Sequence, residues 1–255
     1  MIMELITRYD YPEYTEPLDY HCIWFGGLLD HHILCLSSLF ATQRNPRVTL
    51  WTDAESYPNL TPLRDRFVDR FDIRIGTFRE NTGYGMTVFR ADKWRLQILK
   101  EYGGIYFDMD IVFFKDISWF VNYGKPIVHE GYIAEKAFNN AILYYPKSHP
   151  GLEYWLQRIG DGFFGWSMIL EIQKMSDENF GADMLPNTVS DRGWGGGGPG
   201  CDDFFEKPGL THECMCDSFL YHWHNRWTKS VHNPGTLVNY YWNKYVATPT
   251  SSGHA

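Results

Sequence analysis

The stretch that decides the fold is residues 103–110, which read Gly103-Gly104-Ile105-Tyr106-Phe107-Asp108-Met109-Asp110. Two glycines are followed by a short apolar run and by two carboxylates separated by one residue. Side chains two apart in an extended backbone share a side, so Asp108 and Asp110 are expected to point together. Paired carboxylates at the end of a buried strand suit a hard divalent cation such as Mg2+ or Mn2+, although a short Asp-x-Asp also occurs in solvated turns.

The segment before the glycines, residues 89–102, has the periodicity of a helix. Apolar residues recur there at helical spacing: Ala91, Trp94, Ile98 and Tyr102. Asp92 and Arg95 lie three residues apart, so they are expected to form an ion pair close to the apolar stripe. Such a pair is either an ordinary helix-surface contact or a device that orients a polar ligand beside the two aspartates.

Strand-like and helix-like segments alternate through the first half of the chain. Strands are expected over residues 19–25, 47–51, 72–75, 104–107, 111–114 and 126–129, and helices over residues 28–42, 61–71, 87–102, 149–159, 163–174 and 233–245. This order predicts an α/β fold, a single Rossmann-like domain whose largely parallel central sheet is flanked by helices. Ligands bind such sheets beyond the carboxyl ends of the strands, where Asp108 and Asp110 fall. Residues 1–247 are expected to form this domain, with a mobile tail at 248–255.

Composition limits the class of protein. The chain has 255 residues, of which 44% are hydrophobic and 17% aromatic, enough for one domain with a sizeable core. Its formal net charge of -8 disfavours a nucleic-acid partner. The sequence shows no apolar run long enough for a transmembrane segment and no signal peptide, and its 5 cysteines form no dense framework. We therefore expect a soluble cytoplasmic protein, or a chain that lacks its anchor.

The helix and the strand after it resemble a known family, the DXD-containing sugar transferases. This family includes yeast-type mannosyltransferases, α-1,4-galactosyltransferases and the catalytic domains of clostridial glucosylating toxins. Its pattern reads Ser-Asp-x-x-Arg, then Leu, then Gly-Gly-x-Tyr-x-Asp-x-Asp, and this chain matches every position except the serine, which is Ala91. Weaker likeness covers about residues 19–230, at the segments 21–27, 48–53, 139–150, 198–200 and 221–227.

The resemblance implies a GT-A fold and a metal-dependent glycosyltransferase. Such an enzyme moves a hexose from a nucleotide-diphosphate sugar to a glycan or other hydroxyl acceptor, with retention of configuration. By resemblance, Asp110 and His222 would ligate Mn2+ or Mg2+, with Asp108 contacting the ribose and the sugar and reaching the metal through water.

Further donor-binding residues also follow from the resemblance. Asp92 and Arg95 would fix sugar hydroxyls, Tyr106 belongs to the motif, and Gly198 lies in a glycine-rich loop that could approach phosphates. Trp24 or Trp51 could stack on the base, or either could be core.

Several alternatives stay open on the sequence alone. The chain could be a catalytically inactive nucleotide-sugar or carbohydrate-binding protein, because Ala91 departs from the pattern. A structural zinc site could use five residues: His212, Cys214, Cys216, His222 and His224. The simpler expectation is that these cysteines are ordinary buried residues and that Asp202 or Asp203 caps a short helix.

Overall fold

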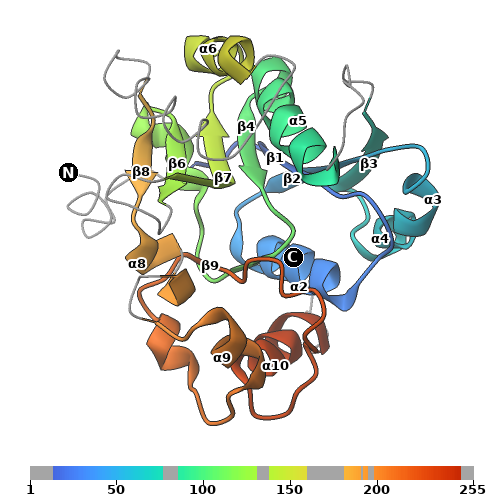
Figure 1. Ribbon diagram of the computed structural model, residues 1–255, viewed down its shortest axis with the longest axis vertical. Coiled ribbons are helices and arrows are strands. Elements are labelled where there is room, and N and C mark those ends of the chain that lie inside the picture. Colours follow the sequence, from blue (N-terminus) through green and yellow to red (C-terminus); the bar gives the residue numbers. More distant parts are fainter. Residues whose placement is uncertain are drawn as a thin grey trace. The chain divides into compact units, whose positions relative to one another are not determined.

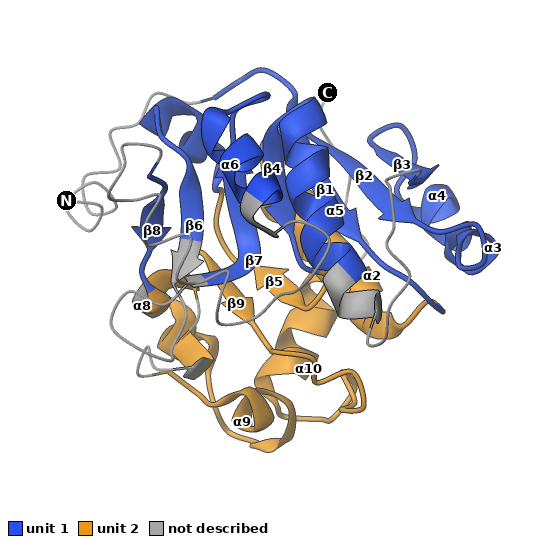
Figure 2. Cartoon of the chain, turned by 45° about the horizontal axis from the view of Figure 1, so that its top comes forward, with its two compact units in different colours: residues 1–27, 44–108, 117–186 blue, residues 28–43, 109–116, 187–255 orange. Residues whose placement is uncertain are grey.

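The computed structural model describes residues 14–76, 86–130, 138–159, 181–190, 192–194 and 198–247. The chain divides into two compact units (Figure 2). The first takes in residues 1–27, 44–108 and 117–186, and the second takes in residues 28–43, 109–116 and 187–255. That residues 1–247 work as a single domain stays a prediction. Within the described residues, no helix combines the length and apolar character needed to cross a bilayer.

The first unit is built on a seven-stranded sheet with the order β3-β2-β1-β4-β7-β6-β8 (Figure 1). The strands are β1 (Leu18–Ile23), β2 (Pro46–Thr52), β3 (Phe71–Ile75), β4 (Gly104–Phe107), β6 (Ile127–Glu130), β7 (Phe138–Tyr145) and β8 (Asp183–Leu185). Strands β3, β2, β1 and β4 run parallel, and β7 joins β4 antiparallel. The predicted α/β fold with a mostly parallel sheet is confirmed.

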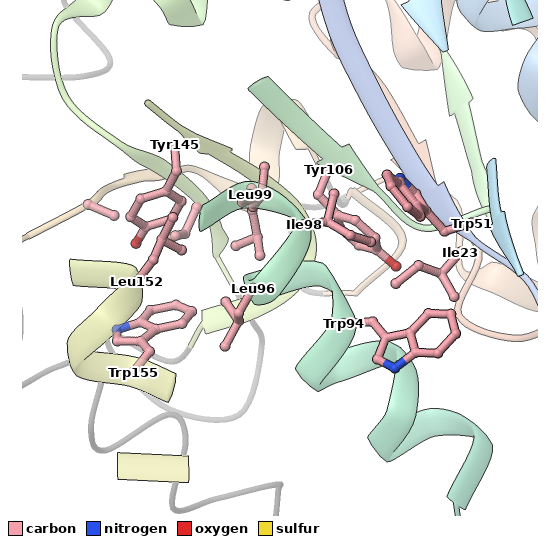
Figure 3. Packing of buried hydrophobic residues seen from close by; sticks show 13 residues of the cluster. Ile23, Trp51, Trp94, Leu96, Ile98, Leu99, Tyr106, Tyr145, Leu152 and Trp155 are labelled. Carbon is pink, nitrogen blue, oxygen red and sulfur yellow. The ribbon is translucent and has the colours of Figure 1, made fainter. Parts of the chain in front are cut away.

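The helices of this unit supply its core. They are α3 (Tyr57–Leu60), α4 (Pro62–Arg66), α5 (Met86–Tyr102), η1 (Ser118–Tyr123) and α6 (Pro150–Ile159). Apolar side chains of α5 and α6 pack with sheet residues in one buried cluster, in which Trp94 and Trp155 are each 1% exposed (Figure 3). The apolar stripe that the sequence predicts is therefore the face of α5 that packs against the sheet and holds this helix beside β4.

The double glycine ends α5 and starts β4. Gly103 has φ +74°, and its N–H donates to the Leu99 carbonyl at 2.8 Å, which closes the last turn of the helix. Gly104 has φ +93°, and a Cβ there would lie 2.3 Å from the Asp19 carbonyl oxygen of β1. Only glycine lets β4 approach β1 this closely. The glycines therefore have a structural task, and Asp108 follows directly after the strand that they start.

His21 links β1 to the end of α5 from inside the unit. Its Nε2 lies 3.1 Å from the Gly103 carbonyl, and the Trp51 Nε1 donates to its Nδ1 at 3.4 Å. A neutral imidazole with its proton on Nε2 satisfies both contacts, because Nε2–H donates to the carbonyl and Nδ1 accepts from the indole. Burial lowers the pKa of His21 from 6.5 to about 4.

Acid is therefore expected to destabilise the protein through His21. The unfolded chain takes up this proton as pH falls below 6.5, whereas the folded chain takes it up only near pH 4, so stability is lost across this window. The loss from this one group amounts to about 3 kcal/mol. Urea denaturation at several pH values should show a shallower decline for His21→Gln than for the wild type. Parallel declines in the two proteins would contradict the assignment.

The second unit contains helix α2 (Asp30–Thr42) and a two-stranded sheet of β5 (Ile111–Phe113) and β9 (Leu220–His222). Its other elements are α8 (Asn187–Ser190), η2 (Arg192–Trp194), α9 (Cys201–Glu206), η3 (His212–Met215), α10 (Leu237–Trp242) and η4 (Asn243–Ala247). The Phe113 N–H donates to the Ser38 hydroxyl of α2 at 3.0 Å. In the antiparallel pair, Ile111 lies opposite His222, so the residue before β5 comes next to the end of β9.

Some sequence-based boundaries were wrong. The helix expected over residues 61–71 is only the short α4 and ends at Arg66, because the chain turns through Asp69 at φ 72° and enters β3. The helix expected over 233–245 starts only at Leu237, after Gly235 at φ +77°. Strand β7 was not predicted, and the strand expected at 111–114 pairs with β9 instead of joining the large sheet. The expected helix 163–174 and tail 248–255 lie outside the described residues.

Candidate active site

In the first unit, four predicted site residues form one network around Arg95. The Arg95 Nη2 lies 3.0 Å from Asp92 Oδ1 and 3.3 Å from Asp108 Oδ1. The Tyr106 hydroxyl donates to the same Asp108 oxygen at 2.7 Å, and the Arg95 guanidinium carbon lies 4.6 Å from the Tyr106 ring centroid. The predicted pair of Asp92 and Arg95 is confirmed, and the fold adds Asp108 to it.

Asn140 of β7 completes this network, and the sequence assigned it no role. Its side-chain nitrogen donates to Asp92 Oδ1 at 2.7 Å, and its backbone carbonyl oxygen accepts from Arg95 Nη1 at 2.6 Å. The resemblance covered this asparagine, but its place depends on the antiparallel pairing of β7 with β4, which has no local sequence signal. Asn140 thus holds both members of the ion pair from a strand far away in sequence.

Most of this network is buried, with Asp108 half-buried, and burial changes the proton affinity of Asp92 and Tyr106. The Arg95 side chain is 4% exposed and that of Asp92 is 11% exposed. Burial raises the pKa of Asp92, and the charge of Arg95 opposes that rise. Burial also raises the pKa of Tyr106 well above its ordinary value, so this hydroxyl stays protonated and donates to Asp108.

Arg95→Lys is expected to lower the free energy of unfolding by about 3 kcal/mol, because lysine cannot reach all the acceptors that the planar guanidinium satisfies. Arg47→Lys is the matched control, since the Arg47–Asp19 pair is exposed at 57% and 41% and such pairs contribute about 1 kcal/mol or less. Urea denaturation of both variants measures the difference. Equal losses would show that Arg95 does not have the structural importance inferred from its burial.

In the second unit, Asp110 and His222 form a buried pair. Asp110 precedes β5 and His222 ends β9, and the His222 Nε2 lies 3.1 Å from Asp110 Oδ1. The Asn225 backbone N–H donates to Asp110 Oδ2 at 2.7 Å. Burial alone would raise the pKa of Asp110, but the charge and hydrogen bond of His222 and the Asn225 N–H lower it to about 2. Asp110 is therefore a carboxylate at any physiological pH.

Asp108 and Asp110 are separated only by Met109, so covalent geometry keeps them near each other. They occupy a bend between β4 and β5, and Met109 is buried at 3% exposure. In the second unit, Asp110 and His222 bring a carboxylate oxygen and an imidazole nitrogen within 3.1 Å of each other. Carboxylate and imidazole are ligands that fit Mn2+ or Mg2+, so Asp110 and His222 are a candidate cation site, and Asp108 stays a predicted further ligand.

His224 lies close to this pair and was given no role in the preferred metal set. Its ring centroid is 3.8 Å from that of His222. Burial lowers the pKa of His224 to about 2, with the charge of His222 acting in the same direction, so His224 is neutral. The resemblance preferred His222 over His224, and the structure places the His222 ring nitrogen against Asp110.

Three further predicted site residues, Trp24, Trp51 and Gly198, make contacts outside the Arg95 network and the Asp110–His222 pair. The Trp24 indole donates to the Gly27 carbonyl at 2.9 Å, and Trp51 is buried in the core cluster at 4% exposure. The Gly198 N–H donates to the Arg192 carbonyl at 3.0 Å, and a Cβ on Gly198 would lie 2.5 Å from Arg192 Cβ. The close approach at Gly198 is therefore to Arg192. Residues 195–197 of its loop are not described.

The expectations for the cysteines and for a helix cap need correction. Cys216 is exposed and Cys214 half-buried, because η3 lies at the surface, and neither cysteine joins the metal-capable group of the described residues. Helix α9 is capped by Gly200 without a side-chain hydrogen bond. Asp202 instead accepts from Arg226 Nε at 2.9 Å.

A cavity of about 350 Å³ in the first unit does not coincide with these residues. It lies at the amino ends of β1, β2 and β3, the opposite edge of the sheet from Asp108, and includes Asp19, His21, Arg47 and Tyr102 in its lining. Arg47 pairs with Asp19 at 2.9 Å, so the charges of these two lining residues neutralise each other.

Comparison with known proteins gives one family resemblance and a shared fold. Residues 30–131 match the model of a family described as glycosyltransferase sugar-binding region containing DXD motif. No curated protein matches the chain. Residues 30–131 are thus similar to the sugar-binding region of these glycosyltransferases, and the predicted resemblance to DXD-containing transferases of the GT-A fold is confirmed.

Solved glycosyltransferases share the fold at low identity. Apo GlyE of Streptococcus pneumoniae TIGR4 has 12% identity and a TM-score of 0.58, over 90% of this chain and 60% of that one. The galactosyltransferase LgtC, solved with donor and acceptor sugar analogs, has 12% identity and a TM-score of 0.53, over 91% and 98%. Mouse xyloside xylosyltransferase 1 in its apo form has 13% identity and a TM-score of 0.50, over 82% and 98%.

Proposed function

We propose that this protein is a metal-dependent glycosyltransferase that moves a hexose from a nucleotide-diphosphate sugar to a hydroxyl acceptor with retention of configuration. The observation that carries the proposal is the buried Asp110–His222 pair, 3.1 Å apart, in which Asp110 lies two residues after Asp108 within the matched sugar-binding region. A buried carboxylate with a pKa of about 2 is ready to bind a cation without first losing a proton.

Asp110 and His222 would hold the cation directly, and Asp108 would complete the set or contact the donor ribose and sugar. When bound, Mn2+ or Mg2+ would neutralise the charge that develops on the departing diphosphate. His222 must offer a neutral nitrogen to do this, so binding of the cation would displace the proton through which the ring contacts Asp110. The chain's own contribution is to hold these donors in place before the donor substrate arrives.

Asp92 and Arg95 would serve the donor sugar. Arg95 is already shared among Asp92, Asp108 and the Asn140 carbonyl, so its main task would be to fix the two carboxylates. Asp92 would then accept hydrogen bonds from sugar hydroxyls in a fixed orientation. Tyr106 would keep Asp108 in place through its 2.7 Å hydrogen bond. Trp24 and Gly198 stay proposed contacts for the nucleotide.

The test is a donor screen with the purified protein after removal of metals by EDTA. UDP-glucose, UDP-galactose and GDP-mannose would each be added with Mn2+, with Mg2+ or without metal, and release of nucleoside diphosphate would be measured. We expect slow metal-dependent release with one donor even without an acceptor. No release and no thermal shift with any donor would contradict the proposal.

A second candidate is a nucleotide-sugar-binding protein without turnover. The observation that favours it is Ala91, which replaces the serine of the family pattern beside Asp92. The same screen separates the two functions: a metal-dependent thermal shift with one donor, but no diphosphate release with any acceptor, would support binding alone.

A further inference from the structure

A strained turn follows β9 in the second unit. His224 has φ 47° and Asn225 has φ 59°, so two consecutive residues other than glycine adopt the left-handed conformation. That conformation costs about 1–2 kcal/mol for a residue other than glycine, although asparagine adopts it more readily than most. Such backbone persists only where surrounding contacts hold it.

Hydrogen bonds hold this turn from two sides. The Arg226 Nη1 donates to the His224 carbonyl at 3.0 Å, and Asp202 of α9 accepts from Arg226 Nε at 2.9 Å. From the other side, the Asn225 N–H donates to Asp110 Oδ2 at 2.7 Å. The left-handed conformation at Asn225 is what directs this N–H to the buried carboxylate.

The side chain of Asn225 makes a further contact. Its Oδ1 accepts from the Trp227 indole Nε1 at 3.0 Å. The Trp227 ring centroid lies 5.6 Å from that of His31 and 5.1 Å from that of His32, both at the start of α2. A single residue therefore contacts both the carboxylate proposed to bind the cation and an indole that packs on two imidazoles.

We propose that Asn225 is a positioning residue that couples the Asp110 carboxylate to the orientation of the Trp227 indole. The backbone N–H of Asn225 fixes one carboxylate oxygen, which leaves Oδ1 of Asp110 on the side of His222. When a cation binds Asp110, the carboxylate is held more tightly, and Asn225 transmits this to Trp227. The cation part rests on the proposed function, whereas the link from Asn225 to Trp227 does not.

Asparagine suits both tasks. It tolerates the left-handed backbone and carries an amide oxygen that accepts from an indole. Glycine would keep the backbone N–H and the turn but lose the acceptor. Aspartate would keep an acceptor of the same length. The pair Asn225→Gly and Asn225→Asp therefore separates the side-chain contact from the backbone contact.

The experiment uses the full chain labelled with 5-fluorotryptophan, and Trp227→Phe assigns the 19F resonance of Trp227. In the wild type, this resonance should move when Mg2+, a diamagnetic cation, is titrated. In Asn225→Gly, the resonance should be displaced already without metal and should no longer follow Mg2+. Calorimetry should show Mg2+ affinity within about twofold of the wild type, because the N–H to Asp110 remains and a tenfold change would need about 1.4 kcal/mol. Asn225→Asp should restore a resonance that follows Mg2+.

Two results would overturn the coupling. One is a Trp227 resonance in Asn225→Gly that matches the wild type with and without Mg2+. The other is an Asn225→Asp variant that behaves like Asn225→Gly, which would show that the acceptor is irrelevant. If the wild type binds no Mg2+ at all, the proposed cation site fails, and the metal-free displacement in Asn225→Gly alone decides whether Asn225 positions Trp227.

Discussion

Asp110→Asn is expected to abolish cation binding and to lower metal-dependent kcat/KM by about 1000-fold or more. Asparagine keeps the size of the side chain and an oxygen that accepts from the Asn225 N–H, but it removes the negative charge beside His222. The lowered pKa of Asp110 means that the folded state stabilises this charge, so the variant is also expected to lose stability, and circular dichroism must show that it is folded before the titration. Calorimetric titration with Mn2+ and the nucleoside diphosphate release assay measure the two effects.

The control for this variant is Asp203→Asn. Asp203 lies in the same unit, is 49% exposed, and pairs with Lys207 at 3.6 Å, so its charge should matter little for the cation site. It is expected to bind Mn2+ as the wild type does. Turnover near the wild-type level in Asp110→Asn with Mn2+ present would remove Asp110 from the proposed cation site.

Gly104→Ala is expected to destabilise the protein by about 3 kcal/mol or more, from the left-handed backbone and the clash together. The added methyl group would lie 2.3 Å from the Asp19 carbonyl oxygen, at a backbone φ of +93°. Relief would require β4 to move away from β1 and would displace Asp108 at the other end of the strand. Thermal unfolding should show a midpoint lower by about 10 °C.

Gly124→Ala separates the two causes. Gly124 has φ +81°, close to that of Gly104, but a Cβ there would meet nothing within 4 Å. This control should therefore lose only the conformational part, about 1 kcal/mol. A midpoint for Gly104→Ala no lower than that of Gly124→Ala would mean that the close approach to β1 is easily relieved.

Much of the fold and part of the site could be predicted from residues near one another in sequence. The stripe on α5, the ion pair of Asp92 and Arg95, and strand β4 depend on local spacing, and the structure has all three. Asn140 and strand β7 could not be predicted in this way. Their place depends on pairing with β4 across a long stretch of chain, and no local pattern encodes that register.

The sequence by itself determined the α/β fold class and the resemblance to DXD-containing transferases, because the spacing of glycines, tyrosine and aspartates in residues 103–110 is local and specific. It also determined that Asp108 follows a buried strand. Only the tertiary structure decided which partner each carboxylate takes. Asp108 lies with Arg95 and Tyr106, whereas Asp110 lies with His222, since β5 pairs with β9. Partners distant in sequence meet through strand pairing and burial, which depend on the whole chain.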